Sequence, residues 1–401
     1  MTPVLLIGAG KIGEMIATML AESGDYQVTV ADRDEDALGR LMNHLPADMP
    51  VVPRTLDVEN DAALSGALSG QYAVLSATPY HLNRSIAPAA KKAGVHYLDL
   101  TEDVRSTRLV KDLAADGGTA FIPQCGLAPG FISIVAHDLT KHFDTLHNVH
   151  MRVGALPVYP SNALKYNLTW STDGLINEYC NPCEAIVDGS LREVPPLEEI
   201  EHFSLDGMEY EAFNTSGGLG TLCETLDGRV QNLNYRTVRY PGHRDIVKLL
   251  LQDLRLAERR DVLKDIFEHA LPMTLQDVVL IFVTVSGYRE GRFMQETFAH
   301  KVYAREVVGR RYSAIQITTA SGICAMLDML HEGQLPAGGF VRQEDAGLKA
   351  FLENRFGAAY GVAADGTATG GAPSDAHGGQ PHGRDTQEGF PWRKAPQRQT
   401  G

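Results

Sequence analysis

The N-terminal segment LLIGAGKIGEMIATML joins an apolar strand-like run to an amphipathic helical run through three glycines, Gly8, Gly10 and Gly13. Their G-x-G-x-x-G spacing, between a strand and a helix, is typical of a dinucleotide-binding turn. Gly8 permits the tight turn, Gly10 lets the backbone approach a pyrophosphate, and Gly13 lets helix and strand pack closely. The helix N-terminus would face the negative charge of the phosphates. The alternative is a tight turn that holds no ligand.

Alternation of strand-like and helical segments continues through the first 125 residues. The strand-like runs are VLLIGAG, YQVTVAD, VVPRTLDV, YAVLSA, VHYLDL and TAFIPQ. Six strands that alternate with helices predict a parallel, doubly wound sheet. We therefore expect a Rossmann dinucleotide-binding domain over residues 1–125.

From about Leu146 the pattern changes to hairpins. EAIVDGSLREV and FSLDGMEYEAF each place Asp-Gly between strand-like runs, and VVLIFVTVSGYREGRFMQETFAHKVYA indicates a long hairpin. The predicted fold class is α/β, with an α/β substrate domain on a mostly antiparallel sheet over residues 126–318. C-terminal helices over 319–360 are expected to return to the first domain. The segment 361–401 is rich in Gly and Pro and lacks periodic apolar residues, so we expect it to be disordered.

Composition excludes several kinds of partner. The chain has 401 residues, 44% of them hydrophobic, and a formal net charge of -14. This charge argues against nucleic acid or an anionic membrane as the main partner, because both require clustered Lys and Arg. No apolar run approaches the roughly 20 residues of a membrane span, and a strand candidate begins at Val4, so we expect a cytoplasmic protein without a signal peptide. Cys180 and Cys183 form a C-x-x-C without a second pair, so no metal site is expected.

Asp32 ends the second strand candidate, where a carboxylate can accept hydrogen bonds from the adenosine ribose hydroxyls. A 2′-phosphate would meet like charge there, which favours NAD over NADP. Arg33 keeps NADP open, because an arginine at this position can hold a 2′-phosphate. The other candidate cofactor-binding residues are Lys11 and Ile12 in the turn, Asp57 after the third strand, and Ala77, Thr78 and Pro79 after the fourth.

Several motifs along the chain resemble those of one known family. They are GAGKIG, YLDLTED, CGLAPGF, YNLTWSTDGLINEYCNPC, FNTSGGLGTLCETL and RTVRYPGH. Together they resemble the saccharopine dehydrogenase-like family, and within it the L-lysine 6-dehydrogenases, from Met1 to about Gly357. The resemblance implies a Rossmann domain, a substrate domain that carries a homodimer contact, and C-terminal helices returning to the first domain. It also implies NAD-dependent oxidative deamination of L-lysine at its ε-carbon, which gives the 6-semialdehyde and ammonia.

Such a reaction needs a proton acceptor, a water-accessible iminium and a charge that fixes the far end of lysine. Arg239 and Arg244 are candidates for holding the α-carboxylate, with surface ion pairs as the alternative. The remaining candidate substrate-binding residues are Tyr80, Asp99 and Thr101 after the fourth and fifth strands, and Asn167 and Thr215 in the family motifs. Helix capping is the alternative for Asp99 and Thr101.

The candidate catalytic residues are Asp173, Glu102 and His243, and the sequence does not rank them as the base. The resemblance implies that relatives acting on saccharopine carry an arginine where this chain has Asp173, in order to hold a carboxylate of the glutamate half. An acid at this position would instead attract the ammonium groups of lysine, although it could also simply cap the helix from Gly174 onward. A saccharopine dehydrogenase, a related NAD(P)-dependent reductase and a non-catalytic NAD-binding sensor remain as alternatives.

Overall fold

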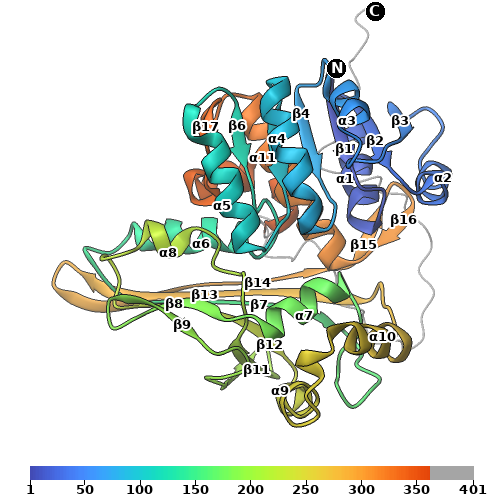
Figure 1. Ribbon diagram of the computed structural model, residues 1–401. Helices are drawn as coiled ribbons and strands as arrows, with labels where there is room; N and C mark the ends of the chain where they lie inside the picture. The colour runs from blue at the N-terminus through green and yellow to red at the C-terminus, as the bar shows by residue number, and fades with distance from the viewer. Residues whose placement is uncertain (362–401) are drawn as a thin grey trace, which may run out of the picture.

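A computed structural model of the chain describes residues 1–361. Apart from Gly361, the tail that we expect to be disordered lies outside the described residues. Two layers are visible in Figure 1: a sheet flanked by helices, and a second, longer sheet beneath it.

The first sheet has seven strands: β1 (Thr2–Ile7), β2 (Tyr26–Asp32), β3 (Val51–Thr55), β4 (Ala73–Ser76), β5 (His96–Asp99), β6 (Ala120–Ile122) and β17 (Gly339–Phe340). All are parallel, in the order β17-β6-β5-β4-β1-β2-β3. The predicted Rossmann sheet is therefore confirmed. The strand order reverses between β1 and β4, and ligands of such sheets bind outside the carboxyl ends of the strands at this point. The two-residue strand β17 is too short to leave a periodic signal in the sequence.

Helices cover both faces of this sheet. One face carries α1 (Lys11–Glu22), α2 (Glu35–His44) and α11 (Ala314–His331), and the other carries α3 (Asp61–Leu68), α4 (Asn83–Ala93) and α5 (Val104–Leu113). The short helices η1 (Tyr80–Leu82) and η2 (Ala114–Asp116) complete the connections. Figure 1 shows α4 and α5 in front of the strands and α11 behind them. Burial on both faces explains why β1 and β4 read as continuous apolar runs.

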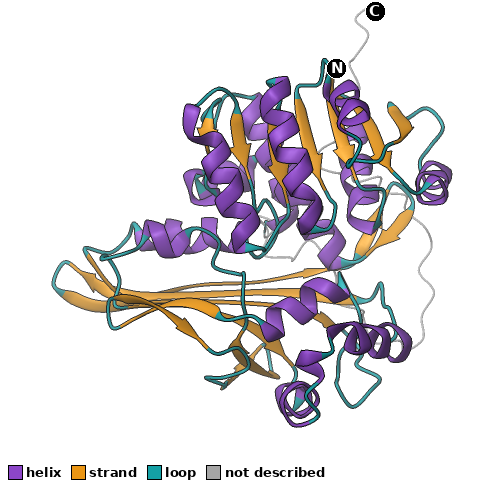
Figure 2. Ribbon diagram, in the orientation of Figure 1, coloured by secondary structure: helices purple, strands orange, loops and turns teal. Residues whose placement is uncertain are grey.

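The second sheet has eight strands: β7 (Thr145–Pro157), β8 (Cys183–Val187), β9 (Ser190–Val194), β10 (Glu201–Leu205), β11 (Met208–Asn214), β12 (Asn232–Arg239), β13 (Asp277–Arg289) and β14 (Arg292–Tyr303). Its main path is β10-β11-β12-β7-β13-β14, with β8 pairing to β12 and β9. Only β12 and β7 pair in parallel, so the mostly antiparallel sheet is confirmed, including the three predicted hairpins. Figure 2 shows this sheet as a long layer of strands under the Rossmann layer.

The remaining elements connect and cover these layers. They are the helices α6 (Phe131–Thr140), α7 (Thr172–Cys180), α8 (Leu222–Thr225), α9 (His243–Lys248), η3 (Leu249–Asp253), η4 (Leu256–Glu258), α10 (Arg260–Ala270), η5 (Gln343–Asp345), α12 (Leu348–Glu353) and η6 (Gly357–Tyr360), and the strands β15 (Arg305–Val307) and β16 (Arg310–Tyr312). Helix α6 packs on β7 and β13, and α10 packs on α7. None of the described helices is long and apolar enough to cross a membrane.

Helix α11 connects the two layers. It packs along α1 and also contacts β13 of the second sheet. Its N-terminus is closed by a capping box of Ser313 and Gln316, and the buried Asp277 of β13 accepts hydrogen bonds from the backbone N–H groups of Ala314 and Ile315 at 2.6 and 3.1 Å. The carboxylate faces the positive end of the helix dipole, which holds the second sheet against the first domain.

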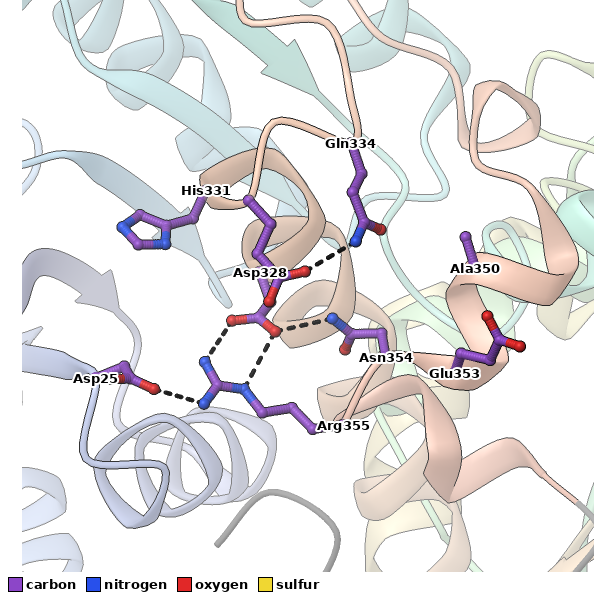
Figure 3. A pocket seen from close by; sticks show the side chains of 9 residues that line it. Asp25, Asp328, His331, Gln334, Ala350, Glu353, Asn354 and Arg355 are labelled. Carbon is purple, nitrogen blue, oxygen red and sulfur yellow. Dashed lines mark hydrogen bonds and ion pairs between the residues drawn. The ribbon is translucent and has the colours of Figure 1, made fainter. Parts of the chain in front are cut away.

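An ion-pair network attaches the C-terminal segment to the amino end of β2 (Figure 3). Arg355 contacts Asp25 and Asp328 at 2.6 Å each, and Asp328 also accepts hydrogen bonds from Tyr26 and Asn354 at 2.7 and 2.8 Å. A hollow of about 590 Å³ lies over this network. It faces the amino-terminal edge of the first sheet, opposite the edge at which dinucleotides bind.

Candidate functional site

A cavity of about 890 Å³ lies between the carboxyl edge of the first sheet and the second sheet. The first domain contributes Ile12 of α1 and the segments 77–81 and 100–102 after β4 and β5, and the turn 126–129, which follows β6, lines the cavity beside them. The wall from the second domain comes mainly from α7 and β12. The cavity is therefore placed where a ligand could meet a cofactor bound at the switch point.

The glycine turn has the geometry that a dinucleotide requires. Gly8 has a φ of +111°, and a Cβ there would lie 2.6 Å from the carbonyl oxygen of Ala77. A Cβ at Gly13 would lie 1.8 Å from the carbonyl oxygen of Gly8, so only glycine permits this contact. Gly10 precedes the first residue of α1, and a Cβ built on it meets no heavy atom within 4 Å. The space in front of the helix N-terminus is thus open to a phosphate, and these residues fit a dinucleotide.

The surface expected to hold the cofactor, here called the cofactor track, runs along the carboxyl edge of the first sheet. Asp32 lies at one end of it, at the tip of β2. Its carboxylate accepts hydrogen bonds from the backbone N–H groups of Ala9 and Asp34 at 2.7 and 2.9 Å, which fixes it beside the glycine turn. Arg33 and Asp57 are exposed near this end of the sheet, and Asp57 accepts a hydrogen bond from the backbone N–H of Glu59 at 3.0 Å. Toward the other end of the track, Ile12, Ala77, Thr78 and Pro79 line the cavity, whereas Lys11 points to Met273.

Strand β12 presents alternate residues to the cavity. Tyr235, Thr237 and Arg239 line it, as the period of two in a strand requires, while Arg236 points the other way and pairs with Glu199 and Glu201. Arg239 is 3% exposed, and its guanidinium carbon lies 5.0 Å from the ring centre of Tyr166. Among the described residues its Nη2 has no hydrogen-bond partner, since Nε and Nη1 make its two hydrogen bonds. An arginine in this state is suited to receive a carboxylate from a ligand.

Two buried side chains, Tyr179 and His243, hold Arg239 in place. Its Nε donates to the Tyr179 hydroxyl at 2.9 Å, and the Tyr179 hydroxyl lies 3.0 Å from Nε2 of His243. Nδ1 of His243 lies 2.8 Å from the carbonyl oxygen of Leu164, so Nδ1 carries the proton and Nε2 accepts from Tyr179. Burial, together with the charge of Arg239, lowers the pKa of His243 to about 3. His243 therefore acts as a neutral support and does not line the cavity.

Helix α7 presents a face of Gly174, Asn177 and Glu178 to the cavity. Glu178 is 8% exposed, and no described residue donates a hydrogen bond to its carboxylate. Burial raises the pKa of Glu178 to about 8, while Arg239 lowers it and Glu102 adds to the rise. Glu102, half-buried after β5, is the second carboxylate in the wall, and burial raises its pKa to about 6.

A backbone segment of the second domain, residues 216–217, contacts both of these glutamates outside their carboxylate groups. The N–H of Ser216 donates to the carbonyl oxygen of Glu178 at 3.1 Å, and a Cβ at Gly217 would lie 3.1 Å from Cβ of Glu102. The cavity thus contains two carboxylates with raised pKa values and one buried guanidinium. Such perturbed groups gathered in one cavity are typical of an active site.

Asp173 lies at the rim of the cavity and is exposed. Its side chain is 61% exposed and pairs with Lys264 of α10 at 2.7 Å. The helix begins at Thr172, and its cap is Ser171, whose hydroxyl accepts from the N–H of Gly174 at 3.2 Å. The alternative of Asp173 as the cap of a helix starting at Gly174 is therefore corrected, because Ser171 already fills that position.

The other predicted site residues divide into two groups. Tyr80, Thr101 and Glu102 line the cavity. The structure does not bring Asp99, Asn167, Thr215, Arg244 and His243 to its wall. Asp99 is fully buried and ties β5 to the chain after β6 through the N–H of Gln124 at 2.9 Å. Arg244 pairs with its neighbour Asp245 at 3.3 Å.

The sequence interpretation missed Glu178, Tyr235 and Trp170. Glu178 follows Gly174 by one helical turn, so the helical period of NEYC could have placed both on one face. Trp170 packs over Gly174, where a Cβ would lie 2.3 Å from its ring. No local sequence signal shows that the face of α7 with Gly174 and Glu178 lies toward Glu102, because this arrangement depends on how the two domains pack together.

Fold and site together define a dinucleotide-binding protein of two layers, with a ligand cavity closed between them. Residues 4–122 match the saccharopine dehydrogenase NADP binding domain, and residues 126–355 match the saccharopine dehydrogenase C-terminal domain. The chain belongs to the saccharopine dehydrogenase family, and the resemblance of its motifs to that family is confirmed.

Individual relatives are distant. A saccharopine dehydrogenase [NADP(+), L-glutamate-forming] of Pyricularia oryzae is 25% identical over 262 residues, covering 62% of this chain and 56% of the relative. The mitochondrial alpha-aminoadipic semialdehyde synthase of Bos taurus is 22% identical over 322 residues, covering 75% of this chain and 33% of the relative. The chain thus spans about half the length, or less, of the curated relatives it matches. The structure of apo saccharopine dehydrogenase (L-Glu forming) from Saccharomyces cerevisiae shares the fold, with a TM-score of 0.73 at 18% identity over 89% of this chain and 98% of that one.

Proposed function

We propose that this chain is an NAD-dependent amine dehydrogenase that converts L-lysine to 2-aminoadipate 6-semialdehyde, which cyclises, with release of ammonia. The observation that carries the proposal is the set of charged groups in the inner wall of the cavity: the carboxylates Glu102 and Glu178 and the buried guanidinium of Arg239, whereas Asp173, Arg260, Asp261 and Lys264 lie at the rim. L-lysine has one carboxylate and two amino groups, which is the complementary set. Burying any of these charges without a partner would be unfavourable.

The cavity's own residues can bind and orient such a substrate. Arg239 can donate a hydrogen bond from Nη2 to the α-carboxylate, because the Tyr179 hydroxyl and the carbonyl oxygen of Val238 already accept from its other two nitrogens. A lysine held in this way would direct its ε-carbon toward residues 77–79, and Trp170 and Ile176 give the wall apolar surface against which its methylene groups could pack. A bound nicotinamide dinucleotide supplies the acceptor for the hydride that leaves the ε-carbon. Water adds to the resulting iminium, and ammonia leaves.

Preference for NAD follows from Asp32, whose carboxylate stands at the tip of β2. A 2′-phosphate would approach this negative charge, whereas ribose hydroxyls can donate to it. The names of several relatives specify NADP(+), so cofactor choice is part of the proposal for this chain.

A second candidate is a saccharopine dehydrogenase that releases glutamate. Arg260 and Lys264 of α10 lie at the cavity rim, where they could hold the carboxylates of a glutamate half. Both are already engaged, however: Arg260 donates to the side-chain oxygens of Asn177 and Asn181 at 3.0 Å each, and Lys264 pairs with Asp173. The rim residues therefore support saccharopine as the substrate less strongly than the charged groups of the inner wall support L-lysine.

Three substrate analogues test the charge complement. L-lysine, 1,5-diaminopentane, which lacks the carboxylate, and 2-aminohexanoate, which lacks the ε-amine, are each incubated with the protein and NAD, and reduced cofactor and ammonia are measured. We expect turnover of L-lysine, at least a tenfold lower kcat/KM for 1,5-diaminopentane, and no ammonia from 2-aminohexanoate. Equal rates with all three would contradict a site built around two amines and one carboxylate.

A further inference from the structure

We propose that Glu178 accepts a proton from the ε-ammonium group of the substrate, so that the amine enters the reaction uncharged. The inference rests on the proposed function. It gives a role to Glu178, for which neither the sequence motifs nor the names of the relatives indicate any role. It stands on the position of Glu178 in the cavity wall, its lack of a donor among the described residues, and the presence of Arg239 and Glu102 in the same wall, close enough for their charges to act on it.

The surroundings of Glu178 favour the protonated form of its carboxyl group. The titratable groups that face it are Tyr166 before α7, Tyr179 on α7, Cys183 on β8, Tyr235 and Arg239 on β12, and Glu102 after β5. Of these, only Arg239 carries a positive charge. When a substrate carboxylate neutralises that charge, Glu178 is left without a cation until an ammonium group arrives.

The proton transfer is balanced as a simple exchange. The N–H bond of the ε-ammonium breaks, an O–H bond forms on Glu178, and the pair of opposite charges becomes a neutral amine and a neutral acid. In a dry site the neutral pair is well tolerated. The freed lone pair on nitrogen then stabilises the carbon from which hydride leaves.

The other acids and bases near the cavity are less suited to this step. Asp173 is exposed at the rim, and its carboxylate is already paired with Lys264 at 2.7 Å. His243 does not line the cavity, and both of its ring nitrogens already have partners in Tyr179 and Leu164. Glu102 lies on the cofactor side, after β5, where it is placed to modulate Glu178 by its charge.

The first experiment is the pH profile of kcat/KM for L-lysine with Glu178→Gln, which keeps the shape and removes the proton acceptor. In the unmodified protein the acid limb should follow a group of pKa about 8. In the variant, kcat/KM should fall by about a hundredfold, and the limb should move toward the pKa of about 10.4 of a free lysine ammonium. A loss of less than about threefold with an unmoved limb would overturn the inference.

Two further variants serve as matched tests. Glu102→Gln should move the acid limb to lower pH, because removing a neighbouring negative charge makes ionised Glu178 easier to form. Glu184→Gln is the control: this half-buried carboxylate on β8 pairs with Arg108 at 3.8 Å and does not line the cavity, so the profile should stay unchanged. An acid limb that moves to higher pH in Glu102→Gln would contradict the assignment.

Thermal melting gives a readout that does not depend on turnover. Between the ordinary pKa of 4.5 and about 8, folded Glu178 keeps its proton while the unfolded chain has lost it, so stability falls as pH rises through this window. Glu178→Gln lacks this loss, so its melting temperature relative to the unmodified protein should rise from pH 5 to pH 8. If the melting temperature of the variant relative to the unmodified protein stays constant or falls with pH, Glu178 does not have the raised pKa on which the inference depends.

These tests separate the role of Glu178 from the proposed function. If the unmodified protein oxidises saccharopine and leaves L-lysine unchanged, the proposed function fails, and the same acid limb is then measured with saccharopine. A limb abolished by Glu178→Gln under those conditions still supports Glu178 as the proton acceptor, and a retained limb overturns it.

Discussion

At the scale of single residues, a relay of hydrogen bonds fixes the one buried guanidinium of the site. Arg239 donates to Tyr179, which donates to the neutral His243, and His243 donates to the carbonyl oxygen of Leu164. His243 therefore acts on the substrate through two other residues. It is a positioning residue, although the sequence suggested a proton carrier.

Tyr179→Phe tests this relay. The change removes the acceptor for Nε of Arg239, so the guanidinium should hold a substrate carboxylate less firmly. We expect KM for L-lysine to rise by about tenfold with kcat changed much less, since a hydrogen bond to a charged group contributes about 1.5–3 kcal/mol. A fall in kcat at constant KM would instead indicate that Tyr179 acts in the chemical step.

Asp32→Ser tests cofactor choice. Serine can still accept a hydrogen bond from the N–H of Ala9, but it does not repel a 2′-phosphate. The preference for NAD over NADP in kcat/KM should narrow by about tenfold or more. Equal efficiency with both cofactors before any substitution would show that Asp32 does not discriminate between them.

The residues that the sequence placed well are those whose role is local. Gly8 and Gly13 are required by the path and packing of one turn, Gly10 leaves the space before the helix open, and Asp32 ends one strand, so a short motif is enough to find them. Glu178 and His243 depend on contacts across many residues. The charge of Glu178 matters because α7 packs where Arg239 and Glu102 line the same cavity. No periodicity in the sequence predicts that long-range packing.

At the scale of elements, α7 carries two carboxylates in opposite environments. Glu178 lies in the cavity wall, whereas Asp173, five positions earlier, is exposed and paired with Lys264. One helix thus separates an acid with a raised pKa from one in contact with solvent, because successive turns bury only one face.

Asp173→Asn measures this contrast. An exposed ion pair contributes about 0–1 kcal/mol, so kcat/KM for L-lysine should change by less than about threefold, and its pH profile should keep its acid limb. The matched change in the same helix, Glu178→Gln, should produce the large effect. A loss of tenfold or more in Asp173→Asn would return this residue to a direct role in holding the substrate.

At the scale of the whole molecule, the C-terminal segment closes the first domain through β17, α12 and the network of Arg355, Asp328 and Asp25 (Figure 3). The side chain of Asp328 is 1% exposed, and Arg355 is the cation that pairs with it. The network lies at the opposite edge of the sheet from the cofactor track, which predicts a role in stability separate from catalysis.

Arg355→Met tests this role. Removing one partner of a buried pair is expected to destabilise the fold by about 3–5 kcal/mol, which should lower the melting temperature by several degrees. Cofactor affinity of the folded protein should be retained. Lys349→Met is the control, because its pair with Glu353 is exposed and should matter little. Loss of cofactor binding in folded Arg355→Met would contradict the separation of stability from function.

The central claim is that the cavity takes a diamine and releases ammonia, and product analysis tests it most directly. The protein is incubated with NAD and either L-lysine or L-saccharopine, and ammonia, glutamate and reduced cofactor are measured together. We predict one ammonia for each cofactor reduced with L-lysine, and neither ammonia nor glutamate with saccharopine. Glutamate formed from saccharopine, with no ammonia from L-lysine, would contradict the account.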